Sequence, residues 1–254
     1  MTSSFSDVIT NGKLTNFLDG AEKIVFLSHG FLAGDKTGCS AEWEDEMAEN
    51  IQKVEGQKVV TVALCWNSAT FSSLQSLFGG RRRSGLNPPS EQPSSGLKPR
   101  LDIFSSVSGT CQADYTIGGK YYYCASSTAK LGEMLGGMMR IIKEETSISY
   151  FHGIGHSLGA HIMGNVWNFG EFKMDRISGL DPAGPCFDGN TGEIEIEEGT
   201  GSVENLWGLH KNAAYFVDIY HTDGDYFGTT VSKGHLDLFA GKYLLSLTYI
   251  VKYV

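Results

Sequence analysis

The 254-residue chain lacks the apolar segments that mark exported and membrane-spanning proteins. No stretch approaches the roughly 20 apolar residues that a transmembrane helix needs, and the apolar segment 243–254 is too short for one. Residues 1–18 are polar and interrupted, so they lack the apolar centre of a signal peptide. We therefore predict no transmembrane segment, and no signal peptide is visible.

An excess of basic residues is also absent. The 29 Asp and Glu residues outnumber the 20 Lys and Arg residues, which gives a net charge of −9. Nucleic-acid backbones require a basic surface, so this balance argues against a nucleic-acid partner. The short basic run 81–83 could contact anionic lipid, but a solvated loop is the simpler interpretation.

Cysteines are few, and none of their spacings is that of a zinc site. Cys65 lies in an apolar run, where we expect a buried thiol. Cys111 and Cys124 are expected either to bridge a loop, if the protein is secreted, or to stay reduced. The sequence therefore predicts neither a metal site nor a cofactor.

What the chain does contain is an alternation of apolar runs and helical patterns over a composition that is 41% hydrophobic. This alternation is typical of a mostly parallel sheet covered by helices, so we predict a single α/β domain over residues 1–254. The expected strands are 24–27, 58–66, 150–154, 176–180 and 214–220. The expected helices are 43–54, 126–145 and 158–167. The pattern disappears in the polar segment 69–119, which we predict to be a flexible inserted loop.

A Gly-x-Ser-x-Gly motif at Gly155–Gly159 follows the expected strand 150–154. This motif places its serine on a tight strand-to-helix turn, where the hydroxyl projects above the sheet. A serine hydroxyl becomes nucleophilic only with a base and a group that orients the base. We predict that Ser157 is a nucleophile; its alternative role is to cap the next helix.

Two further segments fall where such a nucleophile needs them. Phe31 follows the first strand, and Leu158 follows the serine, so their backbone N–H groups are predicted to form the oxyanion hole. Asp181 ends the strand after the serine helix, in the chain order Ser, Asp, His of an α/β-hydrolase. Its role would be to orient the histidine; its alternative role is an ordinary Asp-Pro turn.

Several segments together resemble the pancreatic lipase family of triglyceride lipases and phospholipases A1. They are Lys23–Phe31, Gly155–His161, Gly179–Pro185, Phe216–Gly224 and Gly234–Asp237. The resemblance implies an α/β-hydrolase fold, a secreted protein and hydrolysis of lipid carboxylic esters at a lipid–water interface. It places the nucleophile at Ser157, the acid at Asp181 and the oxyanion-hole N–H groups at Phe31 and Leu158.

The family's catalytic histidine follows a lid that comes after the Gly-His-Leu-Asp segment. No histidine of this chain stands at that place, and His235 is a weak candidate for the role. We therefore expect a fold that is incomplete at its C-terminus. Codons for Gly241–Tyr243 can contain a splice donor, so residues 242–254 are predicted to be a non-native tail.

The positions that bind calcium in some relatives are Gly208, His210 and Ala213 here, so no calcium site is expected. The sequence thus predicts a serine-type hydrolase acting on triacylglycerol or on the sn-1 ester of a phospholipid. The alternative is a catalytically inactive lipase-like protein that binds lipid and lacks the triad histidine.

Overall fold

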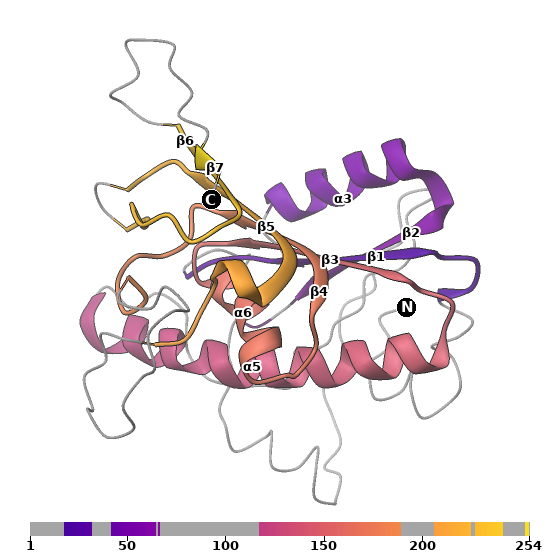
Figure 1. Ribbon diagram of the computed structural model, residues 1–254, viewed down its shortest axis with the longest axis horizontal. Helices are drawn as coiled ribbons and strands as arrows, with labels where there is room; N and C mark the ends of the chain where they lie inside the picture. Colours follow the sequence, from indigo (N-terminus) through magenta and orange to yellow (C-terminus); the bar gives the residue numbers. More distant parts are fainter. Residues whose placement is uncertain are drawn as a thin grey trace, which may run out of the picture.

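The computed structural model describes residues 18–31, 42–64, 66, 117–188, 206–224, 227–240 and 252–253. These residues form one seven-stranded sheet in the order β2-β1-β3-β4-β5-β6-β7 (Figure 1). The strands are β1 (Lys23–Ser28), β2 (Val59–Leu64), β3 (Tyr150–His156), β4 (Met174–Leu180), β5 (Ala214–His221), β6 (Leu236–Phe239) and β7 (Lys252–Tyr253). The first six strands pair in parallel, and β7 pairs antiparallel with β6.

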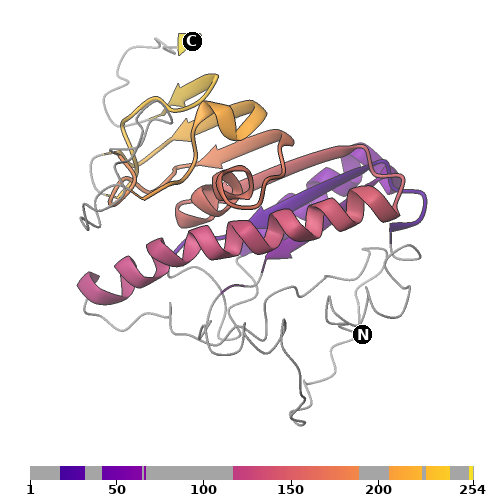
Figure 2. The ribbon, with the colours of Figure 1, turned by 60° about the horizontal axis from the view of Figure 1, so that its bottom comes forward.

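Helices cover both faces of this sheet. Helix α3 (Glu42–Glu55) lies on one face, and α5 (Ile117–Glu145) and α6 (Leu158–Asn168) lie on the other (Figures 1 and 2). The smaller apolar cluster packs α3 against alternate residues of β1, β2 and β3. The larger cluster lies under α5 and α6. Strands that are buried on both faces consist of continuous apolar runs, which is why they can be predicted from the sequence.

The predicted α/β architecture is confirmed, with small differences in length. Helix α5 begins at Ile117, nine residues before the expected start, so the end of the segment 69–119 is helical. Strand β6 was not expected, and β7 lies within the segment predicted to be a non-native tail. The rest of 69–116 and of 242–254 lies outside the described residues. Among the described residues, no helix has the length and apolar character needed to cross a membrane.

The cysteine expectations are met in part. Cys124 is disulfide-bonded. Cys65 and Cys111 lie outside the described residues, so the buried thiol and the Cys111–Cys124 pairing stay predictions.

Candidate functional site

The strand order of the sheet determines where the candidate site lies. The chain passes from β1 outward to β2 and then back to β3 on the other side of β1. The connections that follow β1 and β3 therefore leave the sheet in opposite directions, and in open α/β sheets ligands bind at the carboxyl ends of such strands. Ser28 at the end of β1 pairs with Gly155 near the end of β3, so both loops start at the same level.

Ser157 occupies the sharp turn from β3 into α6. Its backbone adopts φ 54° and ψ −120°, which L-amino acids rarely populate. The Ser157 N–H donates to the Leu180 carbonyl at 3.0 Å. The turn also needs its two glycines: a Cβ on Gly155 would lie 2.4 Å from the Gly159 backbone, and one on Gly159 would lie 2.2 Å from the Ser28 carbonyl oxygen. The local sequence thus fixes the strained serine expected of a nucleophile turn.

The loop after β1 touches this serine directly. A Cβ added to Gly30 would lie 2.6 Å from Ser157 Cβ and 3.1 Å from Ser157 Oγ. The loop is held by His29, whose buried ring stacks on Trp66 and whose Nδ1 donates to the Gly30 carbonyl at 2.9 Å. Only a glycine leaves room for the serine here, which brings the loop backbone next to the hydroxyl.

The two backbone groups predicted for an oxyanion hole flank this contact. Phe31 follows Gly30, and its ring packs edge-on against Tyr121 of α5 with centroids 5.5 Å apart. Leu158 is the first residue of α6, so its N–H has no acceptor within the helix. The structure therefore brings both residues to the neighbourhood of Ser157.

Asp181 stands at the end of β4, one strand away from the serine. Leu180 pairs with His156, so Asp181 and Ser157 each come one residue after a paired position at the same edge of the sheet. Asp181 also has a positive φ, 46°. Its Oδ1 accepts the N–H groups of Thr222 at 2.8 Å and Asp223 at 3.0 Å. Two backbone donors on one oxygen fix the orientation of the carboxyl group.

A buried hydrogen-bonded pair, His221 and Asp237, holds the segment that carries these donors. His221 Nδ1 donates to the Thr229 carbonyl at 2.7 Å, and Nε2 faces Asp237 Oδ1 at 2.8 Å. Asp237 also accepts the N–H groups of Lys233 and Gly234. Thr229 in turn donates its N–H to the Pro182 carbonyl. The chain after β5 is thus tied both to β6 and to the segment that carries Asp181.

Sequence reasoning missed this pair. His221 and Asp237 belong to segments that carried the family resemblance, but no role followed from them. A histidine that ends an apolar strand and an acid in the Gly-His-Leu-Asp segment were the available signal. Because β5 and β6 pair in parallel, such residues come together only once the strand order is known.

The weak candidate His235 has its partners away from Ser157. His235 Nδ1 accepts the Val217 N–H at 3.0 Å, and its ring stacks on Phe216. Val217 pairs with Ile177, four residues before Asp181, or about 13 Å along the strand. The weak candidate His235 therefore lies away from the edge that carries Ser157.

The other histidines have partners elsewhere or face another direction. His152 bonds to Ser178, and His161, His210 and His221 use both ring nitrogens. His156 forms a T-shaped ring contact with Trp43 of α3, with centroids 6.4 Å apart, and its buried Nδ1 has no hydrogen-bond partner among the described residues. Burial lowers the pKa of His156, and the charge of Asp181 opposes that shift, which indicates that the two groups lie near one another.

The positions that the resemblance aligns with a calcium site are Gly208, His210 and Ala213. His210 bonds to Asn168 and to the Asn212 N–H. Within the described ranges, no group of three His, Cys, Asp or Glu side chains could hold a metal ion.

Comparison with known proteins gives a consistent picture. The model of the Lipase family matches residues 108–242, just over half of the chain. Lipase member H-B of Xenopus laevis is 34% identical over 120 residues, 47% of this chain and 23% of the relative. Lipase member H of Rattus norvegicus is 25% identical over 232 residues, 91% of this chain and 37% of the relative. Phospholipase A1 member A of Rattus norvegicus is 33% identical over 126 residues, 49% of this chain and 25% of the relative. The chain thus spans about a quarter to a third of the length of these relatives.

Proposed function

This chain belongs to the lipase family and has the α/β-hydrolase fold, and from that premise we propose that it hydrolyses lipid carboxylic esters. The proposed substrates are triacylglycerols or the sn-1 ester of phospholipids, since the similar relatives include proteins named lipase and phospholipase A1. We also propose an extracellular location, because the disulfide at Cys124 suits an oxidising compartment.

In the proposed reaction, Ser157 Oγ attacks the ester carbonyl carbon and gives its proton to a histidine base. The N–H groups of Phe31 and Leu158 donate to the oxyanion, each lowering the barrier by about 3 kcal/mol. The alcohol leaves with the proton, and an acyl-serine remains. Water then attacks the acyl carbon through the same base and releases the fatty acid. Asp181 orients the imidazole and stabilises its positive form without taking the proton.

One observation carries this proposal: the strained Ser157 lies directly against Gly30, while Asp181 is held at the same sheet edge by two backbone donors. A serine that only capped a helix would need neither the positive φ nor the approach of a second loop. In the described structure, Ser157 makes no side-chain capping bond to α6.

The placement of the histidines supports a second candidate, an inactive lipase-like protein that binds lipid. All seven histidines of the sequence lie within the described residues, and the weak candidate His235 lies away from Ser157. Four others, His152, His161, His210 and His221, are hydrogen-bonded elsewhere. Removing one member of a triad removes most of the rate, because the members act as a unit.

A serine-reactive fluorophosphonate separates the two candidates. The enzyme predicts covalent labelling of the wild-type chain at Ser157, hydrolysis of a short-chain ester, and loss of both in Ser157→Ala. Asp181→Asn should reduce both, with folding checked by circular dichroism. Hydrolysis that persists in Ser157→Ala would refute the nucleophile. Lipid binding with neither labelling nor turnover would favour the inactive lipid-binding protein.

A further inference from the structure

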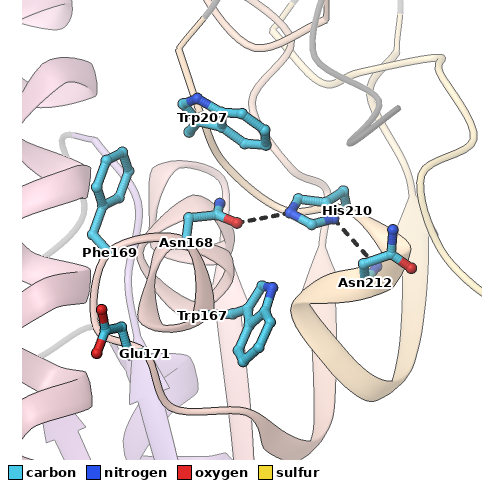
Figure 3. Close-up of a pocket in the computed structure, with 7 residues that line it drawn as sticks. All are labelled: Trp167, Asn168, Phe169, Glu171, Trp207, His210 and Asn212. Atoms are coloured by element: carbon cyan, nitrogen blue, oxygen red, sulfur yellow. Dashed lines mark hydrogen bonds between the residues drawn. The ribbon is translucent and has the colours of Figure 1, made fainter. Parts of the chain in front are cut away.

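A second pocket lies at the opposite end of α6 from Ser157. It has a volume of about 410 Å³ and lies where α6 ends and the segment before β5 begins (Figure 3). Three aromatic rings, Trp167, Phe169 and Trp207, surround it, and Glu171 lines its edge. Trp167 and Phe169 are 40% and 42% exposed, so part of each ring is open to a ligand from solvent.

Two polar side chains of this pocket, Asn168 and His210, already satisfy one another. The Asn168 amide nitrogen donates to Asn165 Oδ1 and to the Gly208 carbonyl, both at 3.0 Å. The Asn168 amide oxygen accepts from His210 Nε2 at 2.8 Å, and His210 Nδ1 accepts the Asn212 N–H at 3.2 Å. These contacts fix His210 as the Nε2–H tautomer. Burial, together with the positive charges of Lys233 and Lys173, lowers the pKa of His210 to about 4, so its ring is neutral at pH 7.

This arrangement excludes several classes of ligand. A sugar or a primary ammonium needs several hydrogen-bond partners, whereas the Asn168 amide and the His210 imidazole are used internally. What remains at the pocket is ring surface, the Asn212 side chain and one carboxylate. An anion would meet Glu171 and the carboxyl end of α6, where the helix dipole places partial negative charge.

The same surroundings favour a cation that needs no hydrogen bonds. Aromatic faces attract cations within about 6 Å of the ring centroid. Trp167 already contacts a cation, since the Lys173 ammonium lies 5.4 Å from the centroid of its ring. The same ammonium lies 5.1 Å from the ring centroid of Tyr215. The net charge of −9 adds a general attraction for cations.

We propose that Trp167, Phe169, Trp207 and Glu171 form a binding site for a quaternary ammonium group, carried by a small soluble choline compound. The trimethylammonium group would lie among the three rings, with the Glu171 carboxylate at its side. The site is separate from Ser157, because the eleven residues of α6 place about 16 Å between them. Binding at this site can therefore be tested independently of the proposed hydrolysis.

Titration of tryptophan fluorescence with choline chloride, at constant ionic strength and pH 7, tests the site. Two of the four tryptophans of the chain line the pocket, so binding should give a saturable signal at roughly millimolar choline. Two ligand controls separate charge from shape. The neutral isostere 3,3-dimethyl-1-butanol and the primary ammonium ethanolamine should each bind at least about fivefold more weakly.

Matched variants test the rings and the charge. Phe169→Leu keeps apolar volume but removes the ring, and should weaken choline binding about threefold or more. Phe216→Leu is the control, because Phe216 is 40% exposed, also faces a cation, and lies on β5 outside the pocket. Glu171→Gln should weaken choline binding, and Lys173→Gln should strengthen it about twofold by removing a competing charge. Urea midpoints of all variants would show that folding is retained.

Equal binding of choline and 3,3-dimethyl-1-butanol would overturn the proposal, as would the absence of a choline signal or an unchanged affinity in Phe169→Leu. Sedimentation with vesicles separates the two sources of the headgroup. Phosphocholine that binds in solution while the chain stays free of phosphatidylcholine vesicles supports the soluble ligand. Sedimentation with phosphatidylcholine but not phosphatidylglycerol vesicles, without soluble binding, would overturn it in favour of a lipid surface.

Discussion

The two ends of α6 differ in how their polar groups are used. A non-glycine residue with positive φ flanks each end: Ser157, φ 54°, before the helix and Glu171, φ 53°, shortly after it. At the first end, Leu158 presents a backbone N–H with no acceptor in the helix, and the serine hydroxyl faces an approaching loop. At the second end, Asn168 and His210 complete each other's hydrogen bonds and leave aromatic rings to face solvent.

This difference separates two kinds of chemistry. A reaction centre needs donors that remain available for charge that develops on the substrate. A pocket for an apolar cation instead needs polar side chains that are already hydrogen-bonded to one another, because an unpaired polar group would hold the water that the cation has to displace. One short helix thus places two unlike surfaces at opposite edges of the same sheet.

The largest expected effect comes from comparing two histidines, one near each end of α6. His221→Leu should lower the free energy of unfolding by about 3–5 kcal/mol, because it removes the imidazole from two buried partners, the Thr229 carbonyl and the Asp237 side chain. His210→Gln, at the other end of α6, removes a neutral ring and should cost less than half as much. Urea unfolding of both variants measures the difference. Equal losses would mean that the His221–Asp237 contact contributes no more than the His210–Asn168 contact.

The close contact of α6 with the first strand gives the next effect. Gly159→Ala places a methyl group against the Ser28 backbone and should destabilise the fold by about 3 kcal/mol. Gly137→Ala on α5 is the control, since its nearest atom is the end of the Arg140 side chain at 3.8 Å. That variant should gain about 0.5–1 kcal/mol from its helix preference. Thermal unfolding followed by circular dichroism distinguishes the two.

Low pH should lower the free energy of unfolding through His210, which lies near the C-terminal end of α6. Its pKa in the folded state is about 4, below the usual 6.5, so the unfolded chain takes up the proton first as the pH falls. The contribution of His210 to the free energy of unfolding is therefore fully present above pH 6.5 and is lost progressively as the pH falls to about 4. Between pH 7 and 5.5, His210→Gln should lose about 1.4 kcal/mol less than the wild type. Parallel pH profiles would contradict a neutral, buried His210.

The smallest effects test the backbone strain at the two ends directly. Ser157→Gly and Glu171→Gly should each raise the free energy of unfolding by about 1 kcal/mol, because glycine adopts positive φ without a steric penalty. Ser157→Gly should also abolish labelling by a fluorophosphonate, whereas Glu171→Gly should leave it unchanged. A loss of stability in either variant would show that the side chain contributes more than the strain costs.

Local patterns predicted much of this molecule. The apolar runs placed β1 to β5 within a few residues, since strands buried on both faces need continuous apolar side chains. The Gly-x-Ser-x-Gly spacing predicted the turn at Ser157, because only glycines permit that geometry. Strand β6 was missed, because its four residues alternate in polarity and are too few to form a clear pattern.

By itself, the sequence determined the order of elements, the serine turn and the family, because each depends on residues close together in the chain. Tertiary structure alone decided that Gly30 touches Ser157, that Thr222 and Asp223 hold Asp181, and that Trp167 and Trp207 share a pocket. The reason is physical. Spacing along the chain sets local backbone geometry, whereas contacts between distant loops depend on which strands pair, and that choice is made by the packing of the whole sheet.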